Sequence, residues 1–559
     1  MPLRYPPAHS EQHAYPLHIG QLFRSALDTH SDQVIVGSDG QRFDYPSFGR
    51  RVHQLAHALT ALGVGPGDVV SAMDWDSHRY LECYFAVPML GAVLHTVNVR
   101  LSPDQIAYTL DSTNPRVLLF HSDFEALVAQ IAPRLSPIVR LVFVRDQPSC
   151  TSPLNPVGEY EELIARYTDD YPFQDVDELA QATTFHTTGT TGQPKAVGFS
   201  HRQLVLHTLA VMGTLGTQPD HQGLRRGDVY MPITPMFHVH AWGIPFIATV
   251  LGLKQVYPGR YEATRLLKLR REEKVSFSHC VPTVLTMLLD AFSSEDPLQQ
   301  PWTILVGGSA LSRDLHRRAA ACGITAVTGY GMSETAPVLS IAYSLAETAD
   351  AREQSLCSAG HPVPLAQLRI VDEAMTTLPT DGEAWGELVA RAPWLTSAYR
   401  GDAEASGQLW KGGWLHTQDI ASITSDGCVE IRDRLKDVIK TGGEWISSVT
   451  MEALIATHPD IAAVAYIGIV DDRWGERPTV FVVPREGAVV DIETLRAYLA
   501  EHVESGVISR YALPDRCVVL DRLPTTSVGK IDKKALRVQL EQEHSQRNHL
   551  STIENMRRD

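Results

Sequence analysis

Residues 183–201 read TTFHTTGTTGQPKAVGFSH and join a strand-like run to a glycine-containing loop. Residues 183–187 resemble a strand, and the glycines that follow let the backbone approach a ligand closely while threonine hydroxyls offer hydrogen bonds. The loop consists of Thr187, Thr188, Gly189, Thr190, Thr191 and Gly192, and Lys195 closes it. This pattern predicts a cradle for phosphate groups, the alternative being a threonine-rich turn without a ligand.

A helix is predicted directly after this loop. Ser200 and Gln203 form a capping-box pattern at the start of RQLVLHTLAVMG, residues 202–213. The loop therefore lies between a strand and a helix N-terminus, where backbone N–H groups favour anions. The Walker A pattern does not fit, because Pro194 stands where that motif needs its second glycine.

The composition predicts a folded, soluble chain with more than one domain. Its 559 residues exceed what one core commonly supports. Hydrophobic residues make up 44% of the chain and charged residues 20%, as in a soluble globular protein. The 49 basic and 65 acidic residues give a formal charge of −16, which disfavours non-specific binding to nucleic acid or anionic membranes. A phosphate-containing ligand must therefore be held by local groups.

Cysteines and apolar runs exclude several other classes. The seven cysteines are scattered and form no CxxC pair, so neither a disulfide framework nor a zinc knuckle is predicted. The N-terminal residues lack the apolar run of a signal peptide, and the longest apolar stretch, residues 241–253, is shorter than a bilayer span. We expect no nucleic-acid partner, no integral membrane segment and a cytoplasmic location.

Alternating helix and strand patterns predict an α/β fold. Residues 22–62 show helical periodicity in FRSALDTH and FGRRVHQLAHALTALG, which Gly63 and Gly65 end. Runs with strand propensity follow at residues 117–120 and 141–144. Strands that alternate with helices favour layered α/β architecture.

A smaller α+β domain is predicted at the C-terminal end. Beyond residue 433 the strand-like runs VAYIGIV, TVFVVP and RCVVL alternate with the helical runs VTMEALIATH and DIETLRAYLAEH. The predicted organisation is a large, multi-subdomain N-terminal domain at 1–432, a hinge at 433–437, a small C-terminal domain at 438–540 and a polar tail at 541–559.

Three more segments carry residues suited to nucleotide chemistry. In TGYGMSET, residues 328–335, Tyr330 offers an aromatic face, Glu334 a hard oxygen ligand and Thr335 a hydroxyl. WLHTQD, residues 414–419, ends in Asp419. Its carboxylate can bind both hydroxyls of a ribose. In TILVGGSALS a strand ends in two glycines whose backbone could line a flat pocket. A packing turn is the alternative for the glycines.

Seven motifs occur in one order along the chain. They are TTGTTGQPK, PMFHVHAWG, GYGMSET, WLHTQD, DRLKD, KTGGEWISS and PTTSVGK. Over about residues 20–540 this order resembles the adenylate-forming superfamily of acyl-CoA synthetases, peptide-synthetase adenylation domains and luciferases. AVLHTVNVRLSP and DRWGERP are most similar to the bacterial medium- and long-chain fatty acyl-CoA synthetases.

The resemblance implies a reaction and a set of ATP contacts. An acid would attack the α-phosphorus of ATP to form an acyl-adenylate and pyrophosphate, and CoA would then take the acyl group. Residues 187–195 would hold the β- and γ-phosphates, Glu334 Mg²⁺ and Thr335 the α-phosphate. The adenine would lie between Gly307, Gly308, Ser309, Ala310, Tyr330 and Gly331, and the ribose on Asp419 and Arg434. Lys530 would bridge the acid carboxylate and the phosphate.

The resemblance also implies domain rotation and an acyl pocket. The small, mobile domain would turn about Lys436 and present Gly442, Gly443, Glu444 and Trp445 to CoA. His238 would border the acyl pocket and Trp242 would gate it, with simple core packing as the alternative; a metal at His238 and His240 is disfavoured because no third ligand cluster accompanies them. The relatives implied by the resemblance form homodimers.

The chain departs from the family pattern at four positions. The family usually has Gly at Gln418, a hydroxyl residue near His186, Gly at Ala196 and Pro at Ser448. None of these changes removes a predicted catalytic group. Other acids or acceptors remain open, including an aryl acid, an amine or carrier protein, or nitrite in an ATP-dependent diazotase. An inactive nucleotide-binding homologue is a further alternative, which the retained Lys530 and Glu334 disfavour.

Overall fold

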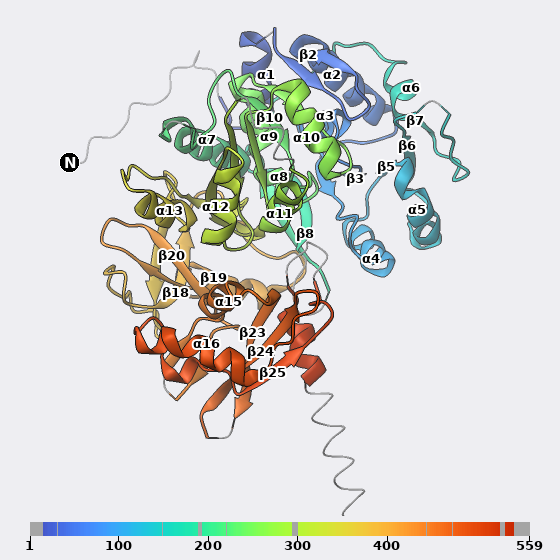
Figure 1. The fold of residues 1–559 in the computed structure, drawn as a ribbon. Coiled ribbons are helices and arrows are strands. Elements are labelled where there is room, and N and C mark those ends of the chain that lie inside the picture. Colours follow the sequence, from blue (N-terminus) through green and yellow to red (C-terminus); the bar gives the residue numbers. More distant parts are fainter. Residues whose placement is uncertain are drawn as a thin grey trace, which may run out of the picture.

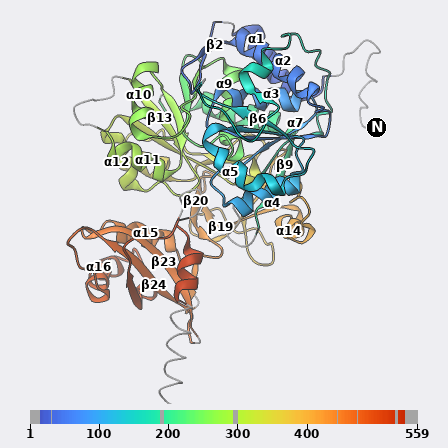
Figure 2. The same ribbon diagram turned by 90° about the vertical axis from the view of Figure 1, so that its right-hand side faces the viewer.

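The computed structural model describes residues 15–30, 32–147, 149–187, 193–219, 221–292, 300–442, 444–471, 473–525 and 531–540. These residues form a large N-terminal body and a smaller C-terminal lobe, which Figures 1 and 2 show as separate units. The mixed α/β architecture with a large first domain and a small second one confirms the predicted fold class.

The first sheet contains the predicted phosphate-binding hairpin at one edge. Its described strands, in spatial order, are β7 (Gly158–Glu159), β6 (Arg140–Val144), β5 (Val117–His121), β3 (Val69–Met73), β4 (Val93–Thr96), β8 (Gln181–Thr187) and β9 (Lys195–Ser200). β9 runs antiparallel to β8, whereas the other pairs are parallel. β5 and β6 confirm the strands predicted at 117–120 and 141–144.

The second sheet crosses the centre of the N-terminal body. Its described strands are β16 (His361–Pro362), β15 (Val338–Ile341), β14 (Ile324–Gly331), β13 (Trp302–Val306), β12 (Phe277–Cys280), β10 (Val229–Pro232), β11 (Lys254–Val256), β1 (Val34–Val36) and β2 (Arg42–Asp44). The two helical patterns predicted within residues 22–62 correspond to α1 (Ile19–Thr29) and α2 (Tyr45–Ala61), but the two strands between them were not predicted. β1 and β2 lie between the first two helices, because buried Ile35 and Val36 extend the sheet beside β11.

Helices occupy the connections of both sheets. The α-helices of the N-terminal body are α1 (Ile19–Thr29), α2 (Tyr45–Ala61), α3 (His78–Met89), α4 (Pro103–Thr113), α5 (Glu125–Ile131), α6 (Tyr160–Ile164), α7 (His201–Thr217), α8 (Val239–Trp242), α9 (Ile244–Leu251), α10 (Ala263–Glu273), α11 (Pro282–Asp290), α12 (Arg313–Ala321), α13 (Ala349–Cys357) and α14 (Ala403–Leu409). Short 3-10 helices are η1 (Ser122–Phe124), η2 (Ala132–Arg134), η3 (Ser333–Thr335), η4 (Lys411–Gly413) and, in the C-terminal lobe, η5 (Arg510–Ala512). As predicted, α2 ends before Gly63, whose φ of 85° suits glycine.

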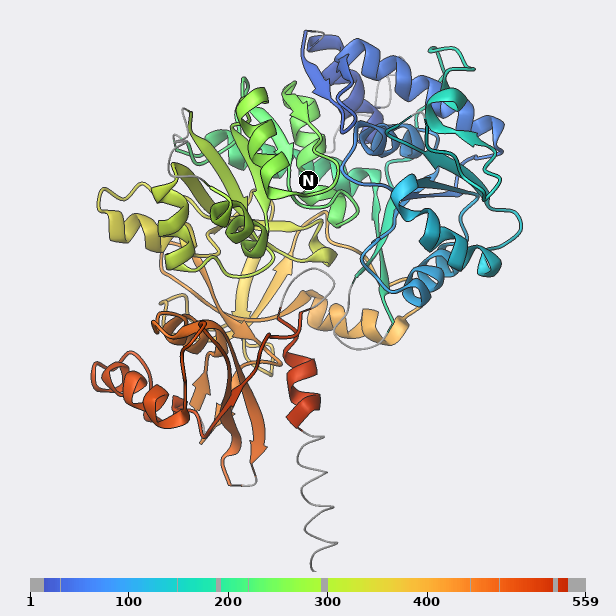
Figure 3. The same ribbon diagram turned by 45° about the vertical axis from the view of Figure 1, so that its right-hand side comes forward.

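A third sheet lies between the two large sheets and the C-terminal lobe, as Figure 3 shows. Its antiparallel strands are β17 (Gln367–Val371), β18 (Gly386–Arg391), β19 (Leu415–Ile423) and β20 (Val429–Arg434). The lobe contains β22 (Glu444–Ile446), β21 (Ile439–Thr441), β24 (Gly475–Pro484), β23 (Ile461–Asp471), β25 (Arg516–Val519), α15 (Ser448–Ala456) and α16 (Ile492–Glu504).

The C-terminal lobe confirms the three predicted strands and both predicted helices as β23, β24, β25, α15 and α16. The hairpin of β21 and β22 was not predicted. The chain leaves the third sheet after β20 and enters the lobe at β21, while the boundaries at 432 and 437 stay predictions. The tail at 541–559 lies outside the described residues. Among the described helices, none combines the length and apolarity needed to cross a bilayer.

A buried carboxyl group joins the first and second sheets. Asp76 follows β3, is 3% exposed, and accepts hydrogen bonds from the Met236 N–H at 2.8 Å and from the Tyr261 hydroxyl. Its own carbonyl oxygen accepts from the Gly259 N–H, just after β11. Burial raises the pKa of Asp76 to about 7, although both hydrogen bonds favour the charged form.

The Asp76→Asn variant should remove a pH-dependent cost to stability. The pKa of Asp76 is higher in the folded chain than in the unfolded chain. The protonated side chain therefore contributes its full stabilisation of the folded state below pH 4, and this contribution is lost as the pH rises through 7. A rise from 3.8 to about 7 corresponds to about 4 kcal/mol. Asparagine keeps an acceptor for Met236 and carries no charge. Denaturant unfolding should show the variant gaining stability relative to the wild-type chain between pH 4 and pH 8; a constant difference would contradict the assignment.

Candidate active site

The hairpin of β8 and β9 places Lys195 at the end of the predicted phosphate cradle. Thr187 ends β8 and pairs with Lys195 across the hairpin. The Lys195 ammonium lies 3.5 Å from an Asp402 carboxylate oxygen and 4.9 Å from the centre of the Tyr399 ring. The predicted cradle residues Thr188, Gly189, Thr190, Thr191 and Gly192 lie outside the described residues. After β9, Ser200 and Gln203 form the predicted capping box of α7.

Glu334 lies beside this hairpin, as part of η3. Its side chain is buried, and the Tyr399 hydroxyl donates to Glu334 Oε1 at 2.7 Å. Burial raises the pKa of Glu334, while this hydrogen bond and the nearby Arg434 and Lys195 favour the carboxylate. The motifs TTGTTGQPK and GYGMSET therefore meet in one cluster of charges.

The segment 396–402 links these motifs, and its role was missed in the sequence. Tyr399 pairs with Val197 of β9, and the Thr396 N–H donates to the Glu334 carbonyl at 2.9 Å. Asp402 caps α14 by accepting from the Ala405 N–H at 2.9 Å. The visible signal is a tyrosine followed by a Gly-Asp helix start, which by itself indicates only a turn.

The Thr335 hydroxyl is engaged within its own turn. Thr335 is fully buried; its Oγ1 accepts from the Met332 N–H at 3.0 Å and lies within hydrogen-bond distance of the Met332 and Pro337 carbonyl oxygens. Its predicted contact with an α-phosphate stays a prediction.

Tyr330, Asp419 and Arg434 meet as a second polar cluster. Asp419 in β19 pairs with Arg434 in β20, and the Arg434 Nε lies 2.8 Å from Asp419 Oδ1. The Tyr330 hydroxyl donates to Asp419 Oδ2 at 2.6 Å. Burial beside the Asp419 carboxylate raises the pKa of the Tyr330 hydroxyl well above its usual value. A ribose bound to Asp419 would compete with these two partners.

The glycines at the ends of β13 and β14 allow close backbone approach. A Cβ atom on Gly307 would lie 2.7 Å from the Gly329 carbonyl oxygen and 3.0 Å from the edge of the Trp242 ring. A Cβ on Gly331 would lie 1.8 Å from the Pro337 carbonyl oxygen. Neither position accommodates a side chain. The neighbouring residues Gly308, Ser309 and Ala310 are exposed.

His238 precedes the short element α8, which is a left-handed turn and not a regular α-helix, and Trp242 ends it. The four residues from Val239 to Trp242 all have left-handed φ values between 47° and 60°. The Trp242 ring is buried, with its centre 5.1 Å from that of His279. His240 lies among aromatic rings, including those of Phe185 and Phe199, and burial lowers its pKa to about 3. His238 and Trp242 thus belong to one short segment.

The predicted hinge and CoA-facing residues lie at the junction with the C-terminal lobe. Lys436 is exposed, and its carbonyl accepts from the Arg537 guanidinium at 3.2 Å. Gly442 has a left-handed φ of 59°, and Glu444 and Trp445 belong to β22. The predicted residues Gly443 and Lys530 lie outside the described residues. The roles of these residues stay predictions.

Two of the departures from the family pattern have structural partners. Ser448 N–H donates to Asp433, and Ser448 Oγ donates to Asp433 Oδ1 at 3.0 Å and accepts from Lys533 at 2.6 Å. Proline could make neither the backbone nor the hydroxyl contact. His186 lies 3.2 Å from His95 and 2.9 Å from the Ser112 hydroxyl. Burial lowers the pKa of His186 to about 4.

The other two departures involve the backbone. Gln418 has a φ of 59°, in the region where a glycine would be unstrained. Its carbonyl accepts from the Leu435 N–H at 2.8 Å. The Ala196 carbonyl accepts from the Arg400 N–H at 3.0 Å.

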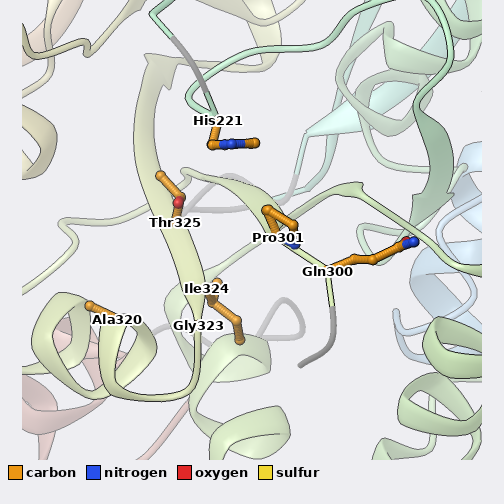
Figure 4. A pocket seen from close by; sticks show the side chains of 7 residues that line it. All are labelled: His221, Gln300, Pro301, Ala320, Gly323, Ile324 and Thr325. Atoms are coloured by element: carbon orange, nitrogen blue, oxygen red, sulfur yellow. The ribbon is translucent and has the colours of Figure 1, made fainter. Parts of the chain in front are cut away.

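Two cavities in the described part of the chain are lined by none of the predicted site residues. Figure 4 shows the first, of about 400 Å³, between His221 and the start of β14. The second, of about 870 Å³, extends from the start of β3 to Arg400. The candidate site is therefore defined by its polar clusters.

Comparison with known proteins places this chain in a family. The model of the AMP-binding enzyme family matches residues 22–400, and that of the AMP-binding enzyme C-terminal domain matches residues 450–530. The crystal structure of the anthranilate CoA ligase AuaEII with anthranoyl-AMP shares the fold, with a TM-score of 0.81 over 94% of this chain and 98% of that chain at 22% identity.

Curated relatives cover nearly the whole chain. The long-chain-fatty-acid–CoA ligase of Thermus thermophilus is 41% identical over 89% of this chain and 90% of its own. The medium-chain-fatty-acid–CoA ligase of Ectopseudomonas oleovorans is 34% identical over 93% and 95%, and the 3-methylmercaptopropionyl-CoA ligase of Ruegeria pomeroyi 33% over 94% and 97%. These matches confirm the resemblance inferred from the motifs: the chain belongs to the AMP-binding enzyme family, among its AMP-forming acid–CoA ligases.

Proposed function

We propose that this ligase activates a medium- or long-chain fatty acid. ATP and the acid would form an acyl-adenylate and pyrophosphate, and the CoA thiolate would then displace AMP to form the thioester. The observation that carries the proposal is the convergence of Lys195, Glu334 and Tyr399 from distant segments beside the β8–β9 hairpin. The acid class follows the names of the 41% and 34% identical relatives. The homodimer implied by the resemblance also stays a proposal.

The polar clusters suit the charges of this reaction. Negative charge grows on the pyrophosphate as the acid attacks, and preorganised cations and N–H groups stabilise it. Lys195, with Thr187 and residues 188–192, would bind the β- and γ-phosphates, and Thr335 the α-phosphate. Asp419 and Arg434 would hold the ribose, and Tyr330 would lie against the adenine together with Gly331 and residues 307–310.

Glu334 suits a magnesium ion that arrives with the nucleotide. Mg²⁺ in such sites takes one or two carboxylate oxygens and fills its other positions with phosphate oxygens and water. Glu334 is a single buried carboxylate, held in place by Tyr399 through one oxygen. The ion would neutralise phosphate charge.

Lys530 is proposed to act only in the adenylation step. A lysine in a C-terminal lobe can reach the acid and the phosphate when the lobe closes, and rotation about Lys436 would withdraw it. In the second step, Gly442, Gly443, Glu444 and Trp445 would face CoA.

The Lys530→Ala variant should lose adenylate formation and keep ATP binding. Removing one preorganised cation from a transition state costs about a hundredfold in rate. We expect acid-dependent pyrophosphate release to fall by about that factor, while calorimetry gives an ATP affinity near that of the unmodified enzyme. Lys534→Ala, at a neighbouring exposed position, is the matched control. Wild-type pyrophosphate release in Lys530→Ala would refute the assignment.

The Tyr399→Phe variant should weaken the use of Mg²⁺ most strongly at low pH. Loss of its hydrogen bond raises the pKa of Glu334 further, so the ligand is protonated over a wider range below neutrality. We expect the Mg²⁺ concentration for half-maximal activity to rise about tenfold at pH 6, the effect of one charged hydrogen bond, and less at pH 8. Tyr498→Phe, in α16, serves as control. An unchanged Mg²⁺ requirement at both pH values would contradict the role of Glu334.

The Trp242→Ala variant should change acid preference. The Trp242 ring lies near both Gly307 and His279, so its removal opens space beside the end of β13. Pyrophosphate release should be measured with and without CoA over C4 to C18 acids, 3-methylmercaptopropionate, aryl acids and nitrite. The preferred chain length should shift and kcat/KM for the original acid should fall about tenfold. An unchanged profile would exclude the gating role, and release that ignores CoA would exclude thioester formation.

A further inference from the structure

The backbone that carries His238 and Trp242 needs external support. Residues 236–243, which we call the wall segment, include four consecutive non-glycine residues in the left-handed region. L-residues adopt that conformation at a steric cost, and a run of them persists only where surrounding contacts determine it. The supports of this segment are therefore part of what places Trp242.

Three buried side chains hold the start of the wall segment. Asp76 Oδ1 accepts from the Met236 N–H at 2.8 Å, and the Tyr84 hydroxyl donates to the Met236 carbonyl. Thr96 Oγ1 donates to the Phe237 carbonyl at 2.9 Å. All three side chains are at most 3% exposed, so water cannot replace a hydrogen bond that is lost.

The supporting residues come from the first sheet and its connections, whereas the wall segment follows β10 of the second. Asp76 follows β3, Tyr84 lies in α3 and Thr96 ends β4. Asp76 is itself fixed, because its second carboxylate oxygen accepts from Tyr261 and its carbonyl from Gly259. These hydrogen bonds therefore fix the wall segment, which follows the second sheet, relative to the first sheet.

The far end of the wall segment has little room to adjust. The Trp242 ring lies 3.0 Å from the position of a Cβ on Gly307, and a Cβ on Gly243 would lie 3.0 Å from the His207 ring. A shift of the Met236 or Phe237 backbone must then appear as a displacement of the rings that follow. Close-packed interiors pass such shifts on because they contain few voids.

We propose that Asp76, Tyr84 and Thr96 are positioning residues that set acid preference by fixing the wall segment. The inference rests on the proposed function, in which Trp242 borders the acyl pocket. Asp76 and Tyr84 belong to no motif by which the family was recognised, whereas Thr96 lies within AVLHTVNVRLSP, to which the sequence assigned no role. They act through the Met236 and Phe237 backbone.

Removal of single hydroxyl groups tests the proposal. Tyr84→Phe and Thr96→Val should each shift the chain-length profile and raise KM for the preferred acid about fivefold, the effect of one buried hydrogen bond, with KM for ATP within about twofold. The matched controls are Tyr45→Phe and Thr109→Val, which remove buried hydroxyls that donate to Leu253 and Ile106. Unchanged acid profiles in Tyr84→Phe and Thr96→Val, or equal shifts in the controls, would overturn the proposal.

Asp76 offers a test by conservative rescue. Asp76→Ala removes the acceptor for the Met236 N–H and should shift the acid profile, whereas Asp76→Asn retains an acceptor and should restore it. If Asp76→Asn shifts the acid profile as much as Asp76→Ala does, the positioning role of the Asp76 acceptor is contradicted. If Asp76→Ala does not fold, Tyr84→Phe and Thr96→Val decide the question.

The Trp242→Ala variant separates this inference from the proposed function. If it leaves the acid profile unchanged, the wall segment does not border the acyl pocket and the proposed gating role fails. If Trp242→Ala shifts the profile and Tyr84→Phe and Thr96→Val do not, only the positioning role fails. Combining Tyr84→Phe with Trp242→Ala should give less than the sum of the two single effects, because both act through one segment.

Discussion

The buried carboxylate of Glu334 constrains the arrangement of the whole site. A carboxylate that is only 6% exposed is costly unless hydrogen bonds and nearby cations offset its desolvation. Tyr399 supplies the hydrogen bond, while Lys195 and Arg434 favour the charged form. These partners come from separate segments, so the hairpin, the turn after β14, segment 396–402 and β20 all contribute to lowering the cost of charge on Glu334.

That requirement also ties the two large sheets together. Lys195 belongs to the first sheet and Glu334 to a turn of the second, so a relative slip of the sheets would separate them. Asp76 links the same sheets through backbone and side-chain hydrogen bonds. Ionisation of such a buried carboxyl group lowers the stability of the fold, but its hydrogen bonds specify one arrangement of the two sheets. The geometry of the proposed nucleotide site around Glu334 and that of the wall segment therefore depend on the same packing of the two sheets.

The parts of the site that were predictable have local physical signatures. Glycines that must lack a side chain, such as Gly307 and Gly331, and the capping box of α7 can be recognised from neighbouring residues alone. The β1–β2 pair, the β21–β22 hairpin and Tyr399 could not, because three-residue strands carry no readable period and Tyr399 depends on pairing with Val197. The chemistry of a carboxylate suggested a ribose partner for Asp419, but no spacing indicates that Asp419 and Arg434 meet, as they do in the structure.

A buried carboxyl group also lies at the junction with the C-terminal lobe. Asp433 is 1% exposed and burial raises its pKa, so the hydrogen bonds from Ser448 and the nearby ammonium of Lys533 offset the cost of its charge. Asp433 precedes Lys436 along the chain, whereas Ser448 and Lys533 follow it. Any rotation of the lobe about Lys436 must therefore separate Asp433 from partners that satisfy it. The orientation seen here is stabilised by that cluster, and a second orientation needs other groups, or water, to take its place.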